Sequence, residues 1–388
     1  MKKLKTIFVF GLLLLSLISC KKNDSVNDYQ YKIPELADDG WEVGSTNDAG
    51  INSAILTEMM NYVNNTPDHN IHNILIFKDE KLIFEEYFEG YLYSANPPGS
   101  NGEFISYNKE TDHYLASVSK TITSVIFGAA VKEGFIDNLN DKVVDIFPEY
   151  NDILSDAKAD ITLKHLLTMS SGLAWDESST SYENPTNDVV ALFNSDDPIA
   201  YTLSRTLLYS PGTQFLYNSG GTNVLGAVVE KATGMSLLDF GNDYLFDPLN
   251  IEGGSWQRLP SGYFFASGGI YLRPRELAKI GYLFLHNGYW GDVQIVTEDW
   301  IAESVDDHIE THGRTLPTAT GYGYQWWLQD FHTGGHTYEC FFAAGWGEQY
   351  MFVFPELEMI VVFNGGNYLS GGSISIFSLL ENYILESL

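Results

Sequence analysis

Apolar and polar positions alternate with two different periods in the first part of the chain. From Ser53 to Asn65, "SAILTEMMNYVNN", the apolar residues recur every three or four positions, which predicts an amphipathic helix. The stretch 73–88, "NILIFKDEKLIFEEYF", contains two apolar runs separated by "KDEK", which is typical of a hairpin. The pattern therefore predicts a helix followed by two antiparallel strands.

Helical periodicity dominates the region from Ser117 to about Trp256. It is carried by four segments, most of which have a helix start or stop residue in place: "TSVIFGAAVKEG", "TLKHLLTMSSG", "TNDVVALFN" and "GTNVLGAVVEKATG". We expect an all-α region here.

Strand patterns return towards the C-terminus in "YGYQWWL", "QYMFVF" and "MIVVF", and "SIFSLLENYIL" predicts a closing helix. From Trp41 onward the sequence shows no repeat, low-complexity block or linker. We therefore predict one α/β unit over residues 41–388, with an antiparallel sheet built from both ends, flanking helices and an inserted all-α domain over about 117–256.

The first residues have a different character. "MKKLKTIFVFGLLLLSLISC" has a basic start and an apolar run that is too short to cross a bilayer, which predicts a secretory signal peptide over 1–19. The end of this stretch, "LISC", resembles a bacterial lipobox, which implies a lipid anchor on Cys20, a polar tether over 20–40, and an exported lipoprotein that is periplasmic or anchored in the outer membrane. The alternative is a signal peptide with an incidental cysteine.

Composition narrows the classes of function. The chain has 388 residues and a formal net charge of −30, so nucleic acid and anionic lipid surfaces would be repelled. We expect no nucleic-acid partner, and membrane contact only through the anchor. If Cys20 carries lipid, Cys340 has no partner in the chain, so no structural disulfide is expected.

A serine and a lysine open the most apolar of the predicted helices. Ser117 and Lys120 stand three residues apart, so a helix would place them on one face. A serine hydroxyl needs a base, and a lysine can serve as one when burial disfavours its charged form. The same spacing recurs at Ser19/Lys22, Ser106/Lys109 and Ser155/Lys158, but only Ser117/Lys120 opens a long apolar helix. The alternative is an N-capping serine with a lysine that reaches solvent.

Two further segments carry candidate chemistry. "FLYNSGG" places Tyr217, Asn218 and Ser219 in a short loop before another helix, where a phenol and small polar groups can face a cleft; a half-buried tyrosine followed by a turn and cap is the alternative. "FFAAGWGEQYMFVFP" places small residues beside a strand, where backbone N–H groups could stabilise an oxyanion. A plain β-bulge would explain this second segment equally well.

The order "SVSK", "YNS" and a glycine-rich strand, together with "LKHLLTMSSGL" and "LYSPGTQFLYNSGG", resembles the serine β-lactamase and penicillin-binding-protein superfamily. The likeness is greatest to its class C-like branch, which contains esterases, D-amino-acid peptidases and 6-aminohexanoate-dimer hydrolases. The resemblance implies a β-lactamase/transpeptidase-like fold and a mechanism without a cofactor. Ser117 would be the acylated nucleophile and Lys120 its partner. Tyr217 would relay protons, and the amides of Ser117 and Ala343 would hold the oxyanion.

The sequence departs from the family pattern at two motifs. Ser219 occupies the position of the usual asparagine, and counting back from Pro355 places Cys340, Phe341 and Phe342 where a Lys/His-Thr/Ser-Gly motif is common. Because no cation stands there, we expect short-chain or aryl esters or small uncharged amides to be better substrates than penicillins or cephalosporins. A non-hydrolytic surface binding protein and a true β-lactamase or D-Ala-D-Ala carboxypeptidase are the alternatives. Arg314 and Arg258 are the first residues to test for a replacement cation.

Other motifs are assigned to structure. "HTGGHTYEC" spaces His332, His336 and Cys340 at intervals of four, but the glycines favour a polar hairpin tip over a metal site. His165 is expected to be structural, and no Gly-x-Ser-x-Gly elbow is present in the sequence. The cluster "GYGYQWWLQD" could line an apolar cleft or pack the sheet, and the sequence does not assign either role to Tyr322, Tyr324, Trp326 or Trp327.

Overall fold

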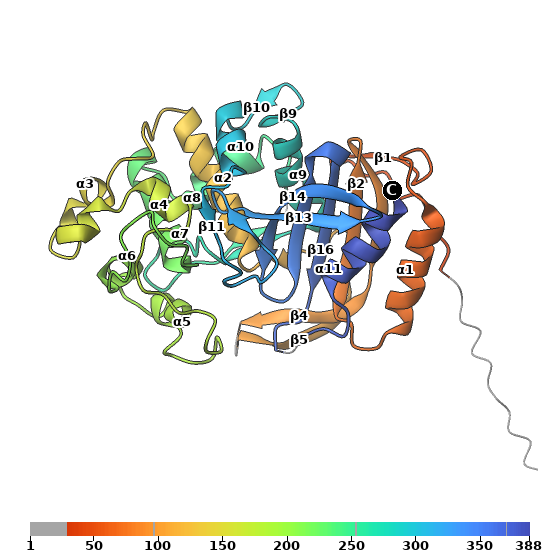
Figure 1. Cartoon of the computed structure of the whole chain (residues 1–388), viewed down its shortest axis with the longest axis horizontal. Helices are drawn as coiled ribbons and strands as arrows, with labels where there is room; N and C mark the ends of the chain where they lie inside the picture. Colours follow the sequence, from red (N-terminus) through yellow and green to blue (C-terminus); the bar gives the residue numbers. More distant parts are fainter. Residues whose placement is uncertain (1–28, 96–97, 253, 370) are drawn as a thin grey trace, which may run out of the picture.

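A computed structural model describes residues 29–95, 98–252, 254–369 and 371–388. Its centre is a nine-stranded sheet with the strand order β1-β3-β2-β16-β15-β14-β13-β12-β11 (Figure 1). Every neighbouring pair is antiparallel except β1 with β3, so the sheet is mixed at one edge only. The strands are Glu42–Val43 (β1), Ile71–Lys78 (β2), Lys81–Tyr87 (β3), Ile309–Glu310 (β11), Gly321–Tyr322 (β12), Trp327–Thr333 (β13), His336–Gly345 (β14), Gln349–Phe354 (β15) and Met359–Gly365 (β16).

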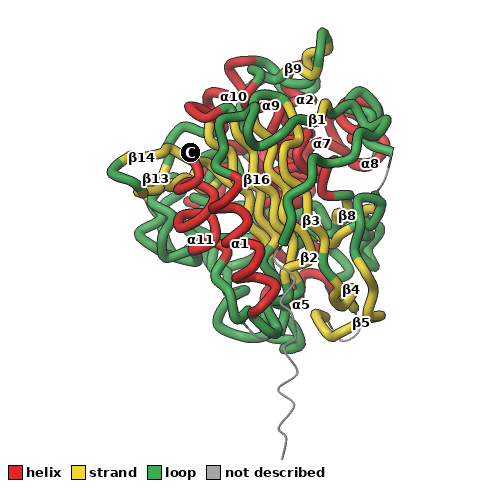
Figure 2. Tube along the Cα trace, turned by 90° about the vertical axis from the view of Figure 1, so that its right-hand side faces the viewer, coloured by secondary structure: helices red, strands yellow, loops and turns green. Residues whose placement is uncertain are grey.

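The predicted first helix and hairpin are confirmed. Helix α1 spans Ser53–Asn65, and the Asn52 side chain caps it by accepting from the Ala54 amide. Its buried residues, Leu56, Met59, Met60 and Val63, repeat at helical spacing and face one side of the sheet. The closing helix also covers this side, as α11 (Ile376–Leu379) continued by the π-helical turn η5 (Leu380–Ile384) (Figure 2).

Helices α2 and α9 cover the opposite face of the sheet. Helix α9 (Pro274–Leu285) packs on β2, β15 and β16, and α2 (Val118–Lys132) packs on β14 and β15. Helix α2 also contacts α7 (Ser219–Thr233) on its other side, so almost its whole surface is buried. This position, between the sheet and the helical region, explains its nearly continuous apolar sequence.

Each of the four predicted helical segments of the middle region contains a helix in the structure. The helices there, besides α2 and α7, are short: Val143–Ile146 (α3), Leu163–Leu167 (α4), Asp188–Phe193 (α5), Pro198–Ser204 (α6) and Leu237–Gly241 (α8), with η1 (Pro148–Tyr150), η2 (Asp156–Asp160) and the π-turn η3 (Asn242–Phe246). A hairpin and a small sheet that the pattern did not predict lie beside this region: β4 (Glu89–Ala95) with β5 (Pro98–Ser106), and β6 (His113–Tyr114) with β8 (Ile270–Leu272) and β7 (Ser255–Trp256).

Five short elements remain, of which the two strands and the helix lie at the top of Figure 1. They are β9 (Tyr289–Trp290), β10 (Val293–Gln294), α10 (Glu298–Ser304), η4 (Pro355–Leu357) and the terminal turn η6 (Leu385–Ser387). The segment "PELE" forms the turn between β15 and β16, with Glu358 in the left-handed region at φ 46°.

The described part of the predicted tether is packed against the domain. The Tyr29 hydroxyl donates to Glu86, the Tyr31 hydroxyl donates to the Ile83 carbonyl, and Asp39 pairs with Arg275 at 2.9 Å. The tether prediction is therefore wrong from Tyr29 onward, because the aromatic rings and Asp39 find partners on the sheet edge and α9. The predicted signal peptide and Cys20 lie outside the described residues. Within the described ranges, no helix is long and apolar enough to cross a membrane.

Candidate active site

Ser117 lies at the start of α2, directly after a residue with unusual backbone geometry. Ala116 has φ 46°, a left-handed conformation that costs a residue with a Cβ some free energy and turns the chain sharply into the helix. The Ser117 side chain makes no capping hydrogen bond, so the N-cap interpretation fails. Among the described residues its amide N–H has no backbone acceptor, which leaves this group available to an oxyanion.

Lys120 points back to Ser117 inside the protein. Its Nζ donates to Ser117 Oγ at 2.9 Å and to the Ser267 carbonyl at 2.9 Å, and the residue is only 2% exposed. The alternative interpretation required a lysine that reaches solvent, and Lys120 does not. Burial lowers the pKa of Lys120 to about 8, although the nearby negative charge of Glu177 opposes this shift. A substantial fraction of the amine is therefore neutral near physiological pH and able to accept a proton.

Tyr217 completes a three-residue cluster. Lys120 Nζ lies 4.9 Å from the centre of the Tyr217 ring, and the Ser117 hydroxyl is close enough to the phenol to influence its pKa. Burial raises the pKa of the phenol well above 10, so it is protonated and can donate to a developing charge. The ring is held by stacking on Trp327 at 5.4 Å. The structure thus brings Ser117, Lys120 and Tyr217 together.

Ser219 is bound to a carboxylate rather than to Lys120. It is the first residue of α7, next to the capping residue Asn218, and its amide and hydroxyl donate to Glu177 at 3.0 and 2.9 Å. Trp175 Nε1 donates to the same carboxylate at 2.5 Å. Three donors therefore hold the Glu177 charge in a buried position at the edge of the site.

The backbone beside Ser117 is that of Gly345 and not that of Ala343. A Cβ added to Gly345 would lie 2.5 Å from the Leu115 carbonyl and 3.1 Å from the Ser117 amide nitrogen, so only glycine allows this approach. Ala343 is buried in the core and paired with Met351. The prediction for Ala343 is therefore wrong, because the register of β14 brings Gly345, two residues further along the strand, to Ser117.

The residues of β14 that face the nucleophile are therefore different from those predicted. Pairing of β14 with β13 ends at Phe342, so Ala343–Gly345 extend beyond β13 and their edge is open toward the site. Cys340 and Phe342 are instead buried in the sheet core. The segment that meets Ser117 still contains no cation.

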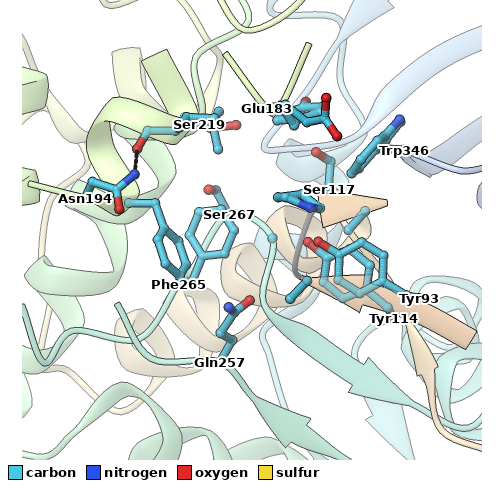
Figure 3. Close-up of a pocket in the computed structure, with 18 residues that line it drawn as sticks. Tyr93, Tyr114, Ser117, Glu183, Asn194, Ser219, Gln257, Phe265, Ser267 and Trp346 are labelled. Carbon is cyan, nitrogen blue, oxygen red and sulfur yellow. Dashed lines mark hydrogen bonds between the residues drawn. The ribbon is translucent and has the colours of Figure 1, made fainter. Parts of the chain in front are cut away.

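Two cavities meet at Ser117, and Figure 3 shows the first of them. The first, about 410 Å³, is mainly aromatic and aliphatic, and its described lining residues include Tyr93, Tyr114, Val190 and Phe265. The second, about 640 Å³, is more polar, and its described lining residues include Tyr217, Glu177, Arg314, Trp327 and Glu348. Both cavities are bounded by Tyr182 and Trp346, whose rings are 4.6 Å apart.

The residues assigned to structure have structural roles. His165 Nδ1 accepts from the Thr162 amide and forms a capping box for α4. His332 and His336 lie on the β13–β14 hairpin, as expected for a polar tip, and no cluster with metal-ligand geometry occurs within the described ranges. Of the aromatic cluster, Trp327 lines the second cavity, whereas Tyr322, Tyr324 and Trp326 are core residues.

The two arginines have different positions. Arg314 borders the second cavity, and its guanidinium donates to the Phe215 carbonyl at 2.8 Å. Arg258 stacks on Phe264 and is not among the described lining residues of either cavity. Arg314 is thus the better placed of the two to meet an anionic substrate group.

Sequence reasoning missed Glu177, Ser267 and Gly345 as site residues. Glu177 lies in the polar stretch "WDESST", and nothing local distinguishes it from the other acidic residues of an acidic chain. Ser267 contributes a carbonyl, which any residue type could supply. Gly345 was within the quoted glycine-rich stretch, and its close approach to α2 could have been suspected from that composition.

Comparisons with known proteins find a matching family model and similar chains. A family model described as Beta-lactamase matches residues 72–365. The 6-aminohexanoate-dimer hydrolase of Paenarthrobacter ureafaciens is 28% identical over 64% of this chain and 65% of its own length. The lovastatin esterase of Penicillium rubens is 34% identical over 36% of this chain and 38% of its own length. The matches thus cover less than two thirds of either relative.

The fold is also found among solved structures. A penicillin-binding-protein homologue from Caulobacter crescentus superposes with a TM-score of 0.65 over 92% of this chain and 100% of its own, at 15% identity. This similarity supports the shared α/β fold.

Proposed function

Because the chain belongs to the β-lactamase family, and its relatives include an amide hydrolase and an esterase, we propose that it is a serine hydrolase that forms an acyl-enzyme on Ser117. The observation that carries this proposal is the 2.9 Å hydrogen bond between Lys120 Nζ and Ser117 Oγ, made by a lysine whose pKa burial lowers to about 8. This pairing supplies the base that a serine hydroxyl needs.

In acylation, Ser117 Oγ attacks the substrate carbonyl while its proton passes to neutral Lys120. The carbonyl oxygen becomes negative and is stabilised by the Ser117 amide and by an amide of the Gly345–Trp346 segment, which takes the role expected of Ala343. Tyr217 donates a proton to the leaving atom and regains one from Lys120. Water then releases the acyl group by the same steps in reverse order. No cofactor is needed.

Glu177 and Ser219 support this chemistry indirectly. The Glu177 carboxylate fixes the first residue of α7 through both Ser219 donors, and Tyr217 precedes that helix by two residues. Its negative charge also favours protonated Lys120. We assign Glu177 as a positioning residue.

The preferred substrates are esters or small uncharged amides. The Ala343–Gly345 segment offers no cation to a substrate carboxylate, and the charged groups at the second cavity include two carboxylates, Glu177 and Glu348, against Arg314. The net charge of −30 adds a weaker disadvantage for anions, because salt screens distant charges. Penicillins and cephalosporins, which carry a carboxylate, are therefore expected to react more slowly.

A fluorophosphonate probe tests the nucleophile directly. We expect one adduct, located at Ser117 by peptide mass spectrometry and missing in Ser117→Ala. An unlabelled wild-type protein that also fails to hydrolyse p-nitrophenyl butyrate would point instead to a non-hydrolytic binding module. Comparing kcat/KM for nitrocefin and p-nitrophenyl butyrate tests the substrate class, and a preference for nitrocefin that is lost in Arg314→Gln would identify a true β-lactamase.

The location of the protein is a separate proposal. The basic and apolar stretch before Cys20 and the "LISC" sequence support export and lipid attachment at Cys20. Metabolic labelling with an alkynyl fatty acid, compared between the full chain and Cys20→Ala, tests it. Equal labelling of both proteins would reject the anchor.

A further inference from the structure

The two cavities that meet at Ser117 differ in chemistry. Around the first cavity, six aromatic side chains and several aliphatic ones form the wall, and the only charged residue among its described lining residues is Glu183. The aromatic residues are Tyr93, Tyr114, Tyr182, Phe193, Phe265 and Trp346. Such a wall favours the binding of an apolar part of the substrate.

The β4–β5 hairpin supplies part of this wall. Tyr93 of β4 stacks on Tyr114 with ring centres 4.0 Å apart and meets Trp346 edge-on at 6.3 Å. Figure 3 shows the rings of Tyr93, Tyr114 and Trp346 on one side of Ser117, with Phe265 on the other. The hairpin and the helical region thus enclose the same apolar space from two directions.

The second cavity contains the proton donor. Tyr217 lines the second cavity and is not among the described lining residues of the first. Glu177, Arg314, Glu348 and Asn367 also border this space, so it carries more charged groups than the first cavity, although six aromatic side chains line it as well. Tyr182 and Trp346, whose rings are in contact, border both cavities.

The position of the proton donor, Tyr217, determines which cavity each half of the substrate occupies. The leaving oxygen or nitrogen must lie within hydrogen-bond reach of the group that protonates it. The leaving group therefore extends into the cavity of Tyr217, and the acyl group extends into the aromatic cavity. Resting on the proposed function, we infer that the enzyme acts on substrates with an aromatic or bulky apolar acyl group and a polar leaving group.

The covalent step balances with these assignments. The bond between Ser117 Oγ and the acyl carbon forms, and the bond from that carbon to the leaving oxygen breaks. The proton of the Ser117 hydroxyl is taken up by Lys120, and Tyr217 supplies the proton that the alcohol carries away. In deacylation, water supplies the hydroxyl of the released acid and returns a proton to Ser117.

A pair of isomeric esters tests the orientation. 2-Hydroxyethyl phenylacetate has an aromatic acyl group and a polar leaving group, whereas 2-phenylethyl glycolate has the same atoms with the groups exchanged. We expect kcat/KM, divided by each ester's rate constant for hydroxide hydrolysis, to favour the phenylacetate by at least about tenfold, the discrimination available to an apolar pocket. An equal or opposite preference would overturn the inference.

Two matched variants test which cavity is responsible for the preference between the esters. Val190 of α5 is among the described lining residues of the aromatic cavity but not of the polar one. Thr315, which is exposed, is among those of the polar cavity but not of the aromatic one. Val190→Trp should lower kcat/KM for the phenylacetate by about tenfold or more relative to its effect on p-nitrophenyl acetate, whose acyl group is small. Thr315→Trp should retain the phenyl-acyl preference and discriminate against larger leaving groups.

The outcomes separate the two proposals. If p-nitrophenyl acetate is hydrolysed at Ser117 but Val190→Trp affects only the leaving group, the orientation is wrong while the serine mechanism stands. If no ester is hydrolysed and no probe labels Ser117, the proposed function itself fails. A urea midpoint of Val190→Trp near that of the wild type shows that this variant is folded.

Discussion

Replacing Lys120 by methionine should abolish activity and also change how stability depends on pH. Methionine keeps much of the volume of the side chain in its buried position but cannot take a proton from Ser117. Wild-type Lys120 is a base whose folded-state pKa lies below its unfolded value. The folded state therefore binds fewer protons than the unfolded state between pH 8 and pH 10.5, and stability rises with pH in that window.

The size of the change in stability follows from the shift in the pKa of Lys120. Burial lowers the Lys120 pKa from 10.5 to about 8, which at about 1.4 kcal/mol per unit destabilises the wild type by roughly 3 kcal/mol below pH 8. Most of this penalty is removed as the pH rises from 7 to 10. The free energy of unfolding of the wild type should therefore increase over this range by about 2 to 3 kcal/mol more than that of Lys120→Met. Other titrating groups are common to both proteins and cancel in the difference.

Urea unfolding of both proteins at several values between pH 7 and pH 10 measures this difference. We expect the stability of the wild type to approach or overtake that of Lys120→Met as the pH rises. Parallel curves would mean that Lys120 does not titrate with a lowered pKa, and the basis for its role as a base would be lost. Turnover of p-nitrophenyl butyrate by Lys120→Met near the wild-type rate would refute the role directly.

Four further predictions concern the same cluster. Ser117→Ala should remove turnover and leave the urea midpoint nearly unchanged, because only a hydroxyl is lost from a partly accessible position; residual turnover near the wild-type rate would exclude Ser117 as nucleophile. Tyr217→Phe should lower the single-turnover acylation rate by about two to four orders of magnitude, and an unchanged rate would assign the proton transfer to another group. In the wild type kcat/KM should rise with pH to a plateau above about 8, as Lys120 loses its proton. Glu177→Gln should move this rise to lower pH, because the carboxylate favours protonated Lys120; a shift to higher pH would contradict the electrostatic assignment.

The sequence by itself determined the local elements and the centre of the site. Helix α1 and the β2–β3 hairpin agree with their predicted spans because their periodicities are properties of neighbouring residues. Ser117 and Lys120 could be paired for the same reason, since three residues on a helix fix their proximity. The motif resemblance then added Tyr217, which is far away in the chain but has a recognisable local sequence.

Only the tertiary structure decided which distant backbone and which unremarkable side chains complete the site. Gly345 replaces Ala343 beside Ser117 because the register of β14 against β13 and α2 sets the approach, and a count along the sequence does not contain that register. Glu177 and the Ser267 carbonyl reach Ser219 and Lys120 through loops whose course depends on packing of the helical region against the sheet. The division into an aromatic and a polar cavity arises likewise where the β4–β5 hairpin, α5 and β14 converge, because a cavity is defined by surfaces that only folding brings together.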